Sequence, residues 1–182
     1  MRNRVRVAML LVAVMMVVLS ACARAPRDAS DKAESGKASS IKGTNLFVLI
    51  DRGIEKSFTD NQVNNRDQVG EYMEQDLPAV LKKSGFNARL INKRSEYRPA
   101  ARSYLLTVKI TNYNPGSKAA RMLVGYGAGA TSMDTHFELF GSGSTPLLSD
   151  NQSVGSGRDW RNVIRKINEQ TTKAVAKKVS AL

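Results

Sequence analysis

The chain has 182 residues, one cysteine, one histidine and a formal net charge of +12 at pH 7. A single cysteine excludes an internal disulfide, a CxxC redox pair and a zinc site built from several cysteines. A single histidine excludes a two-histidine metal motif. The length fits one domain, and a hydrophobic content of 42% is sufficient for a core. The basic balance at first suggests binding to nucleic acid or to another anionic surface.

The amino terminus has the pattern of a targeting signal. Arg2, Arg4 and Arg6 precede an uninterrupted apolar run of 13 residues, 7–19. This run is shorter than the roughly 20 residues that a membrane-spanning helix needs, and it matches the hydrophobic region of a secretory signal. Small residues follow the run, and the only cysteine of the chain, Cys22, stands directly after them.

Residues 19–22, Leu-Ser-Ala-Cys, resemble a bacterial lipobox, in which the chain is cut before the cysteine and the cysteine is acylated. We therefore predict a signal peptide over 1–21 and a lipid anchor on Cys22. The alternatives are an ordinary secretory signal with a chance cysteine, or an uncleaved anchor. Ala23 stands where enterobacterial lipoproteins retained in the inner membrane carry aspartate. We therefore expect a periplasm-facing location at the outer membrane, rather than the inner membrane.

Removal of the signal would lower the formal charge from +12 to +9, because 1–21 contains three arginines and no acid. An exported lipoprotein does not meet genomic DNA, so we expect no nucleic-acid partner. Residues 22–44 are rich in Ala, Ser, Lys, Asp and Gly and have no apolar periodicity. This composition predicts a flexible tether between the lipid and a single domain over 45–182.

Hydrophobic periodicity divides the domain into strands and helices. Five consecutive apolar residues, 46–50, predict a strand buried on both faces. A polar loop over 59–66 and a helix over 67–84 follow, with Pro78 expected to kink the helix or break it near Leu77. Three further strands are expected over 87–91, 104–113 and 131–140, with a basic loop over 92–102 between the first two. An edge strand over 147–154 and a helix over 158–182 complete the domain.

The resulting order is β-α-β-β-β-β-α. Helices alternate with strands too rarely for a doubly wound sheet. We therefore predict an α+β fold, with a mixed or mostly antiparallel sheet of about five strands packed by two helices. In the strand 131–140, alternation places Met133, Thr135, Phe137 and Leu139 on one face, which is expected to be the core face.

The glycine-rich stretch Gly125–Gly129, together with Ala130, formally fits the GxGxxG/A pattern of dinucleotide-binding turns. That function requires a helix directly after the glycines, so that the helix amino terminus meets pyrophosphate. Here a strand is expected next, which favours a structural bend or loop. The apolar residues 122–124 beside the glycines leave contact with a membrane or a partner open as a third possibility.

Asp134, His136 and Glu138 share the other face of the strand 131–140 and are residue types that bind metals. One strand rarely completes a coordination sphere, so a solvated sheet face is the simpler interpretation. We therefore expect no cofactor, and we keep a metal-dependent envelope hydrolase centred on these three residues as an alternative function.

Paired carboxylates of the kind that glycosidases use are also present. Two pairs stand close in sequence, Glu74 with Asp76 and Asp51 with Glu55. Their spacing does not distinguish them from ordinary surface acids. No GxSxG, HExxH or GxxxxGK[ST] motif occurs in the chain.

Positive charge gathers in two segments, 82–102 with a net charge of +6 and 158–182 with +5. Solvated surfaces are one explanation. The other is a surface that binds anions of the cell envelope, such as lipid phosphates, lipopolysaccharide or peptidoglycan carboxylates. Arginine pairs well with such groups. The candidates are Arg89, Arg94, Arg98, Arg102, Arg158, Arg161 and Arg165.

Taken together, these parts resemble an uncharacterised family of small Gram-negative lipoproteins. The resemblance rests on the lipobox, a helix ending near Gly85-Phe86, the alternating strand 104–111, the Gly125–Gly129 stretch running into 131–140, and a closing helix. The arrangement also looks like lipoproteins of the YajG type and the amino-terminal domain of TolB. One departure is the run Gly-Ser-Gly-Ser at 141–144, where an acidic-glycine turn is usual.

The resemblance implies an envelope assembly or interaction role without established catalytic residues. We therefore predict a membrane-anchored, non-catalytic binding or assembly module. An envelope protein, lipopolysaccharide or peptidoglycan is the expected partner. Binding of anionic envelope polymers or lipids by the two basic segments is a further alternative. The apolar stripe of the last helix fits packing on its own sheet and pairing with another subunit equally well, so it does not decide the oligomeric state.

Overall fold

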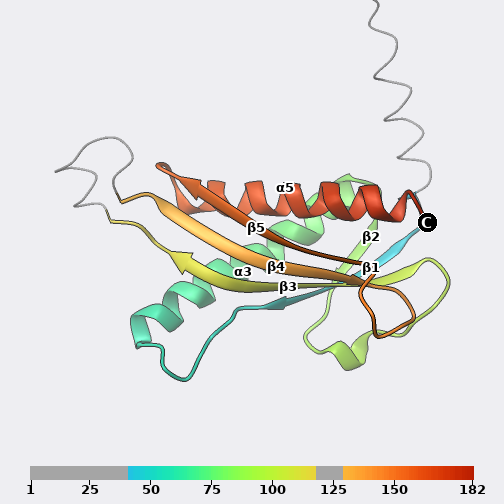
Figure 1. The fold of residues 1–182 in the computed structure, drawn as a ribbon, viewed down its shortest axis with the longest axis horizontal. Coiled ribbons are helices and arrows are strands. Elements are labelled where there is room, and N and C mark those ends of the chain that lie inside the picture. The colour runs from blue at the N-terminus through green and yellow to red at the C-terminus, as the bar shows by residue number, and fades with distance from the viewer. Residues whose placement is uncertain (1–40, 118–128) are drawn as a thin grey trace, which may run out of the picture. The chain divides into compact units, whose positions relative to one another are not determined.

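The computed structural model describes residues 41–117 and 129–182. These residues form a five-stranded mixed sheet with two helices on one of its faces (Figure 1). The α+β class and the order β-α-β-β-β-β-α are as predicted. The strands are β1 (Asn45–Asp51), β2 (Asn87–Leu90), β3 (Ser103–Asn114), β4 (Thr131–Phe140) and β5 (Leu148–Ser156). The helices are α3 (Asp60–Lys83) and α5 (Trp160–Val179), and a single 3-10 turn, η2 (Arg94–Glu96), lies between β2 and β3.

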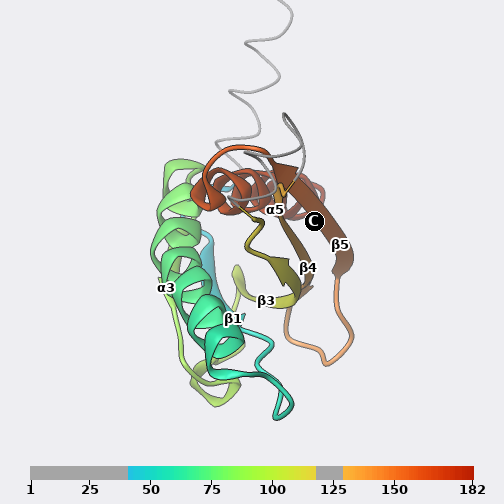
Figure 2. The ribbon, with the colours of Figure 1, turned by 90° about the vertical axis from the view of Figure 1, so that its left-hand side faces the viewer.

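The strands follow the order β2-β1-β3-β4-β5 across the sheet. β1 runs parallel to both β2 and β3, whereas β3, β4 and β5 are antiparallel neighbours. The parallel pair β1 and β2 is connected through α3, as parallel strands require a crossover. β5 lies at an edge of the sheet, as expected. Figure 2 shows both helices on the same side of the sheet, where α3 contacts β1 and β2, and α5 contacts β4 and β5.

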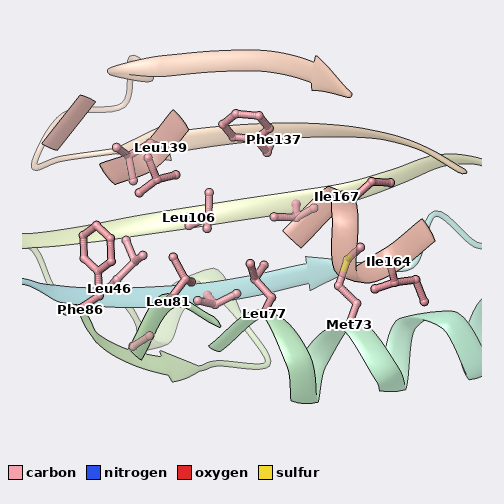
Figure 3. Close-up of a cluster of buried hydrophobic side chains, with 14 of the residues drawn as sticks. Leu46, Met73, Leu77, Leu81, Phe86, Leu106, Phe137, Leu139, Ile164 and Ile167 are labelled. Atoms are coloured by element: carbon pink, nitrogen blue, oxygen red, sulfur yellow. The ribbon is translucent and has the colours of Figure 1, made fainter. Parts of the chain in front are cut away.

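The hydrophobic core lies between the sheet and the two helices (Figure 3). Alternate residues of β4 point into it, and Met133, Phe137 and Leu139 are fully buried there. Thr135 is 1% exposed on the same face, so the predicted alternation is confirmed. Helix α3 contributes Met73, Leu77 and Leu81, while α5 contributes Val163, Ile164, Ile167 and Val175. Ile41, the first described residue, packs in the same core.

Helix α3 begins at Asp60, so the loop predicted over 59–66 is wrong. Thr59 caps the helix: its side chain accepts a hydrogen bond from the backbone N–H of Gln62, and the Gln62 side chain accepts one from the Thr59 backbone N–H. This capping box satisfies two of the N–H groups that a helix start leaves without partners. The polar residues that follow are therefore helical, and they extend the helix by two turns.

Of the two outcomes predicted for Pro78, a kink or a break near Leu77, the break is wrong, because α3 continues through Pro78 to Lys83. Proline removes one helix hydrogen bond, which costs stability in a helix interior. Here the turns around it are held by packing, since Leu77 and Leu81 are fully buried in the core. Beyond the helix, the backbone N–H of Phe86 donates to the carbonyl of Leu81, which closes the carboxyl end.

Helix α5 starts later than the predicted residue 158, since Asp159 is its cap and accepts a hydrogen bond from the backbone N–H of Arg161. Its apolar stripe packs on the sheet of the same chain, with Val163, Ile164 and Ile167 fully buried. Neither α3 nor α5, the long helices of the described residues, has a stretch apolar enough to cross a membrane.

Candidate binding surfaces

The face of the sheet opposite the helices is partly covered by the segment 92–102. A second, smaller hydrophobic cluster lies beneath it, formed by Phe47, Ile91, Leu105 and Phe140. Phe47 is the middle residue of the buried stretch of β1, so this strand is covered on both faces at that point, as its sequence predicted. The hydrophobic run 46–50 thus supplies both layers of the fold.

Tyr97 fixes this segment to the sheet. Its hydroxyl oxygen lies 2.9 Å from the carbonyl oxygen of Ser103 and 3.0 Å from that of Gly141, so it donates at the point where β3 begins and β4 has ended. The Tyr97 ring meets the Phe47 ring edge to face, with 5.3 Å between ring centroids. Burial raises the pKa of Tyr97, because the charged phenolate would lose hydration there.

Two of the predicted arginines lie over aromatic rings of this smaller cluster. The guanidinium carbon of Arg89 is 4.0 Å from the centroid of Phe47, and that of Arg94 is 4.1 Å from the centroid of Phe140. We call Phe47, Tyr97, Phe140, Arg89 and Arg94 the arginine–aromatic cluster. A guanidinium stacked on a ring keeps its N–H groups in the ring-parallel plane, where they are available to an anion. The residues 82–102 thus place two cations over the rings of the smaller cluster.

Two further arginines of this segment have different surroundings. Arg98 is exposed on the covering segment. Arg102 has a positive φ of 54° and donates through Nη2 to the carbonyl oxygen of Lys42, at 2.8 Å. Arg102, the residue directly before β3, therefore connects the start of the described chain to the sheet.

The arginines of the second basic segment lie elsewhere, at the start of α5. Arg161 forms an ion pair with Asp159 at 3.3 Å and lies 4.8 Å from the centroid of Trp160. Arg165 donates to the side-chain oxygen of Asn162, and Arg158 is exposed just before the helix. In Figure 1, α5 begins at the end of the sheet opposite η2. The arginines at the start of α5 therefore lie apart from Arg89 and Arg94.

The structure does not bring Asp134, His136 and Glu138 together as a metal site. Nδ1 of His136 lies 2.9 Å from the side-chain oxygen of Asn151, and its Nε2 lies 3.9 Å from Oε1 of Glu138. Asp134 instead accepts a hydrogen bond from Asn112 at 3.1 Å. Within residues 41–117 and 129–182, no group of three or more His, Cys, Asp or Glu could hold a metal ion.

The paired carboxylates are separated by their own partners. Glu74 accepts two hydrogen bonds from Nη2 of Arg52, at 3.0 and 3.1 Å, while Asp76 accepts one from Asn168 at 2.8 Å. Asp51 accepts a hydrogen bond from the backbone N–H of Gly53. The contacts of Glu74 and Asp76 connect different elements of the fold, to the residue after β1 and to α5, and do not aim these two carboxylates at a common point.

The glycine-rich stretch falls largely outside the described residues, which resume at Gly129. The element that follows is β4, a strand, so the helix that a dinucleotide site requires is not there. At the base of this connection, the backbone N–H of Ser117 donates to the carbonyl oxygen of Gly129 at 3.0 Å. Cys22 and the predicted signal also lie outside the described residues.

Sequence analysis missed a polar site at the carboxyl ends of β1 and β3. Arg52 follows β1 and pairs with Asp67 at 2.7 Å and Glu74 at 3.0 Å, and its bond to Asp67 raises its pKa. It crosses α3 at Gly70, where a Cβ atom would lie 2.6 Å from the Arg52 side chain. A β-carbon at residue 70 would therefore force the Arg52 side chain to shift.

Arg66 lies on α3 one turn before Gly70. The sequence analysis placed it in a loop, but in the structure it is only 5% exposed. The capping pattern Thr-x-x-Gln at 59–62 was the signal that could have found it, because a helix starting there puts Arg66 on the same face as Val69 and Met73.

The family comparison matches a Domain of unknown function (DUF4410) over residues 30–178, and the chain belongs to this family. No curated protein matches. A PelC dodecamer from Paraburkholderia phytofirmans shares 14% identity, with a TM-score of 0.49 over 76% of this chain and 88% of that chain. A putative neuraminyllactose-binding hemagglutinin homolog from Helicobacter pylori shares 12% identity, with a TM-score of 0.37 over 75% of this chain and 83% of that one. The likeness to the YajG type and to TolB stays a prediction.

Proposed function

We propose that this protein is a lipid-anchored, non-catalytic binding module of the bacterial envelope, whose arginine–aromatic cluster binds an anionic envelope component. The anchor is Cys22, supported by the ordered pattern of basic residues, apolar run and lipobox. The binding surface is supported by one observation above all, the placement of Arg89 over the Phe47 ring and of Arg94 over the Phe140 ring.

The stacking matters because it fixes the position of two cations before any partner arrives. A long arginine side chain normally loses rotamer freedom on binding, which opposes association. Arg89 and Arg94 are exposed but already held over Phe47 and Phe140, 4.0 and 4.1 Å from the ring centroids. Less freedom therefore remains to be lost. Their N–H groups suit the paired oxygens of phosphate and carboxylate.

The anchor is tested by metabolic labelling with a fatty acid in the host cell. Wild-type protein should take up label and fractionate with membranes, whereas Cys22→Ser should lose both. Equal labelling of Cys22→Ser would refute the anchor.

The outer-membrane location has its own test. Ala23→Asp should move the protein from the outer- to the inner-membrane fraction of a density gradient in an enterobacterial host.

Anion binding is tested by co-sedimentation of the protein with lipopolysaccharide and, separately, with purified peptidoglycan. The double variant Arg89→Gln, Arg94→Gln should lose most binding, and the matched variant Arg161→Gln, Arg165→Gln should keep it. Raising the salt from about 50 to about 500 mM should weaken binding, because exposed charges are screened within a few ångströms at the higher value. Binding of one material only would identify which of the two is the partner, and equal loss in both double variants would refute the assignment to this cluster.

A further inference from the structure

A pocket of about 400 Å³ lies at the carboxyl ends of β1 and β3, beside the first turns of α3. Figure 1 shows α3 beginning next to the arrowhead of β3. The arginine–aromatic cluster lies toward the other end of these strands, at Phe47 and Leu105 near their starts. The pocket and the proposed binding surface are therefore separate places on the domain.

The inner wall of the pocket carries the buried cation Arg66. Its Nη1 donates to the carbonyl oxygen of Ile110 at 3.1 Å, and its Nη2 is 3.5 Å from that of Thr111. The pairing of β3 with β4 shifts register between Ile110 and Asn112, so an irregularity of the strand lies at this contact. Gly53 covers it, since a Cβ atom there would lie 2.0 Å from the Ile110 oxygen.

These carbonyl contacts leave the charge of Arg66 without a counter-ion. No carboxylate of the described residues lies within 4.0 Å of its guanidinium, in contrast to Arg52 with its two acids. A buried charge without an ionic partner is costly, and burial accordingly lowers the pKa of Arg66. Glu55 acts on it only from a distance, as an exposed residue at the rim. An anion in the pocket would supply the missing partner.

The remaining walls combine amides with aromatic rings. Asn65 and Asn112 line the pocket together with Phe58 and Tyr113. The Phe58 ring lies on the guanidinium of Arg66, with 5.6 Å to its centroid. Side-chain amides both donate and accept hydrogen bonds, as hydroxyl groups of a ligand require, and aromatic rings pack against the apolar face of a small molecule.

From this arrangement we infer that the pocket binds a small anionic molecule, whose carboxylate or phosphate pairs with Arg66 and whose hydroxyl groups bond to the amides. The volume is at the lower end of the range found for small-molecule sites. Carboxylate and phosphate share the chemistry that an arginine fork recognises, and the experiment separates them.

The test is isothermal titration calorimetry on the full chain with three probes of the same ring: glucuronate, glucose 6-phosphate and glucose. We expect at least one charged probe to bind, and glucose to bind at least about tenfold more weakly, because it cannot pair with Arg66. The stronger charged probe identifies the anionic group. Failure of both charged probes to bind, or equal binding of glucose, would overturn the inference.

Charge changes at the pocket provide the matched variants. Asn65→Asp adds a negative charge to the wall and should weaken anion binding about fivefold, the effect of one like charge at contact distance in water. Asn64→Asp adds the same charge one residue away, at an exposed position outside the lining, and should leave the affinity unchanged. Equal effects of the two variants would overturn the inference.

Two further variants test the roles of Glu55 at the rim of the pocket and of Arg66 in its wall. Glu55→Gln removes the negative charge nearest to Arg66 and should strengthen anion binding by about twofold or more. Arg66→Lys keeps the charge but loses the paired N–H groups, and should weaken binding of the charged probe. Should the lysine variant fail to fold, Asn65→Asp and Glu55→Gln decide the question, since both positions face the pocket. Unchanged affinity in Glu55→Gln and Asn65→Asp together would refute the site.

Discussion

The two faces of the sheet differ in burial and polarity, although neighbouring residues of the same strands form both. On the helix face, Phe137 is fully buried between the sheet and two helices, while on the other face the side chain of its neighbour His136 is 34% exposed. The helix face is apolar and continuous. The opposite face carries a small aromatic cluster under stacked arginines and then an open polar surface. The continuous hydrophobic core therefore lies on one face, and the proposed binding surface of the arginine–aromatic cluster lies on the other.

The largest expected effect tests the difference between the two faces within a single strand, β4. Phe137→Ala should lower the free energy of unfolding by about 3–5 kcal/mol, because it leaves a cavity in the main core. His136→Ala, one residue earlier and on the opposite face, should change it by no more than about 0.5 kcal/mol. Urea unfolding of both variants measures the difference. Similar losses would mean that the polar face also carries much of the stability.

A smaller effect is expected where the covering segment is fastened to the second face. Tyr97→Phe removes the hydrogen bond from the hydroxyl and should cost about 1 kcal/mol. The folded-state pKa of Tyr97 is raised above its unfolded value, so its contribution is full below the unfolded pKa, near 10, and is lost as the pH rises through the folded pKa.

Wild-type stability should accordingly fall more steeply than that of Tyr97→Phe above about pH 10. Unfolding by urea at several alkaline pH values measures the two curves. Their difference at each pH isolates Tyr97, since lysines and other tyrosines titrate in both proteins. Parallel curves would show that the hydroxyl does not hold the segment through this bond.

The smallest effect concerns the stacked cations themselves. Arg94→Ala should cost about 0.5–1 kcal/mol, the value of an exposed cation over an aromatic ring. Arg98→Ala, in the same segment and exposed, should cost less than about 0.5 kcal/mol. The pair, compared by urea unfolding, shows whether the arginine–aromatic cluster is ordered in solution. Equal values would indicate that Arg94 does not remain on its ring.

Much of the fold could be predicted because hydrophobic periodicity is a local property. The alternation of 131–140 identified the buried face of β4, and the continuous run 46–50 identified a strand covered on both faces. The start of α3 was missed because its first two turns are polar and their order comes from the Thr59 cap. The predicted break at Leu77 was wrong because packing outweighs the cost of Pro78.

The candidate sites were less predictable, because they depend on which residues meet in space. The sequence singled out Arg89 and Arg94 by charge alone. It contained no sign that Phe47 and Phe140, from distant strands, would lie beneath them. Arg66 was overlooked for the same reason, since its acceptors on β3 are 44 and 45 residues away along the chain.

By itself, the sequence determined the element order, the class of the fold and, as a prediction, a lipid anchor on Cys22. Its count of one cysteine and one histidine and its net charge of +12 set the limits of its chemistry. Only the tertiary structure decided that the arginines of the two basic segments lie apart, that Arg89 and Arg94 lie over aromatic rings, and that Arg66 is buried in a pocket. The physical reason is that periodicity and charge act along the chain, whereas pairing between strands brings distant residues into contact.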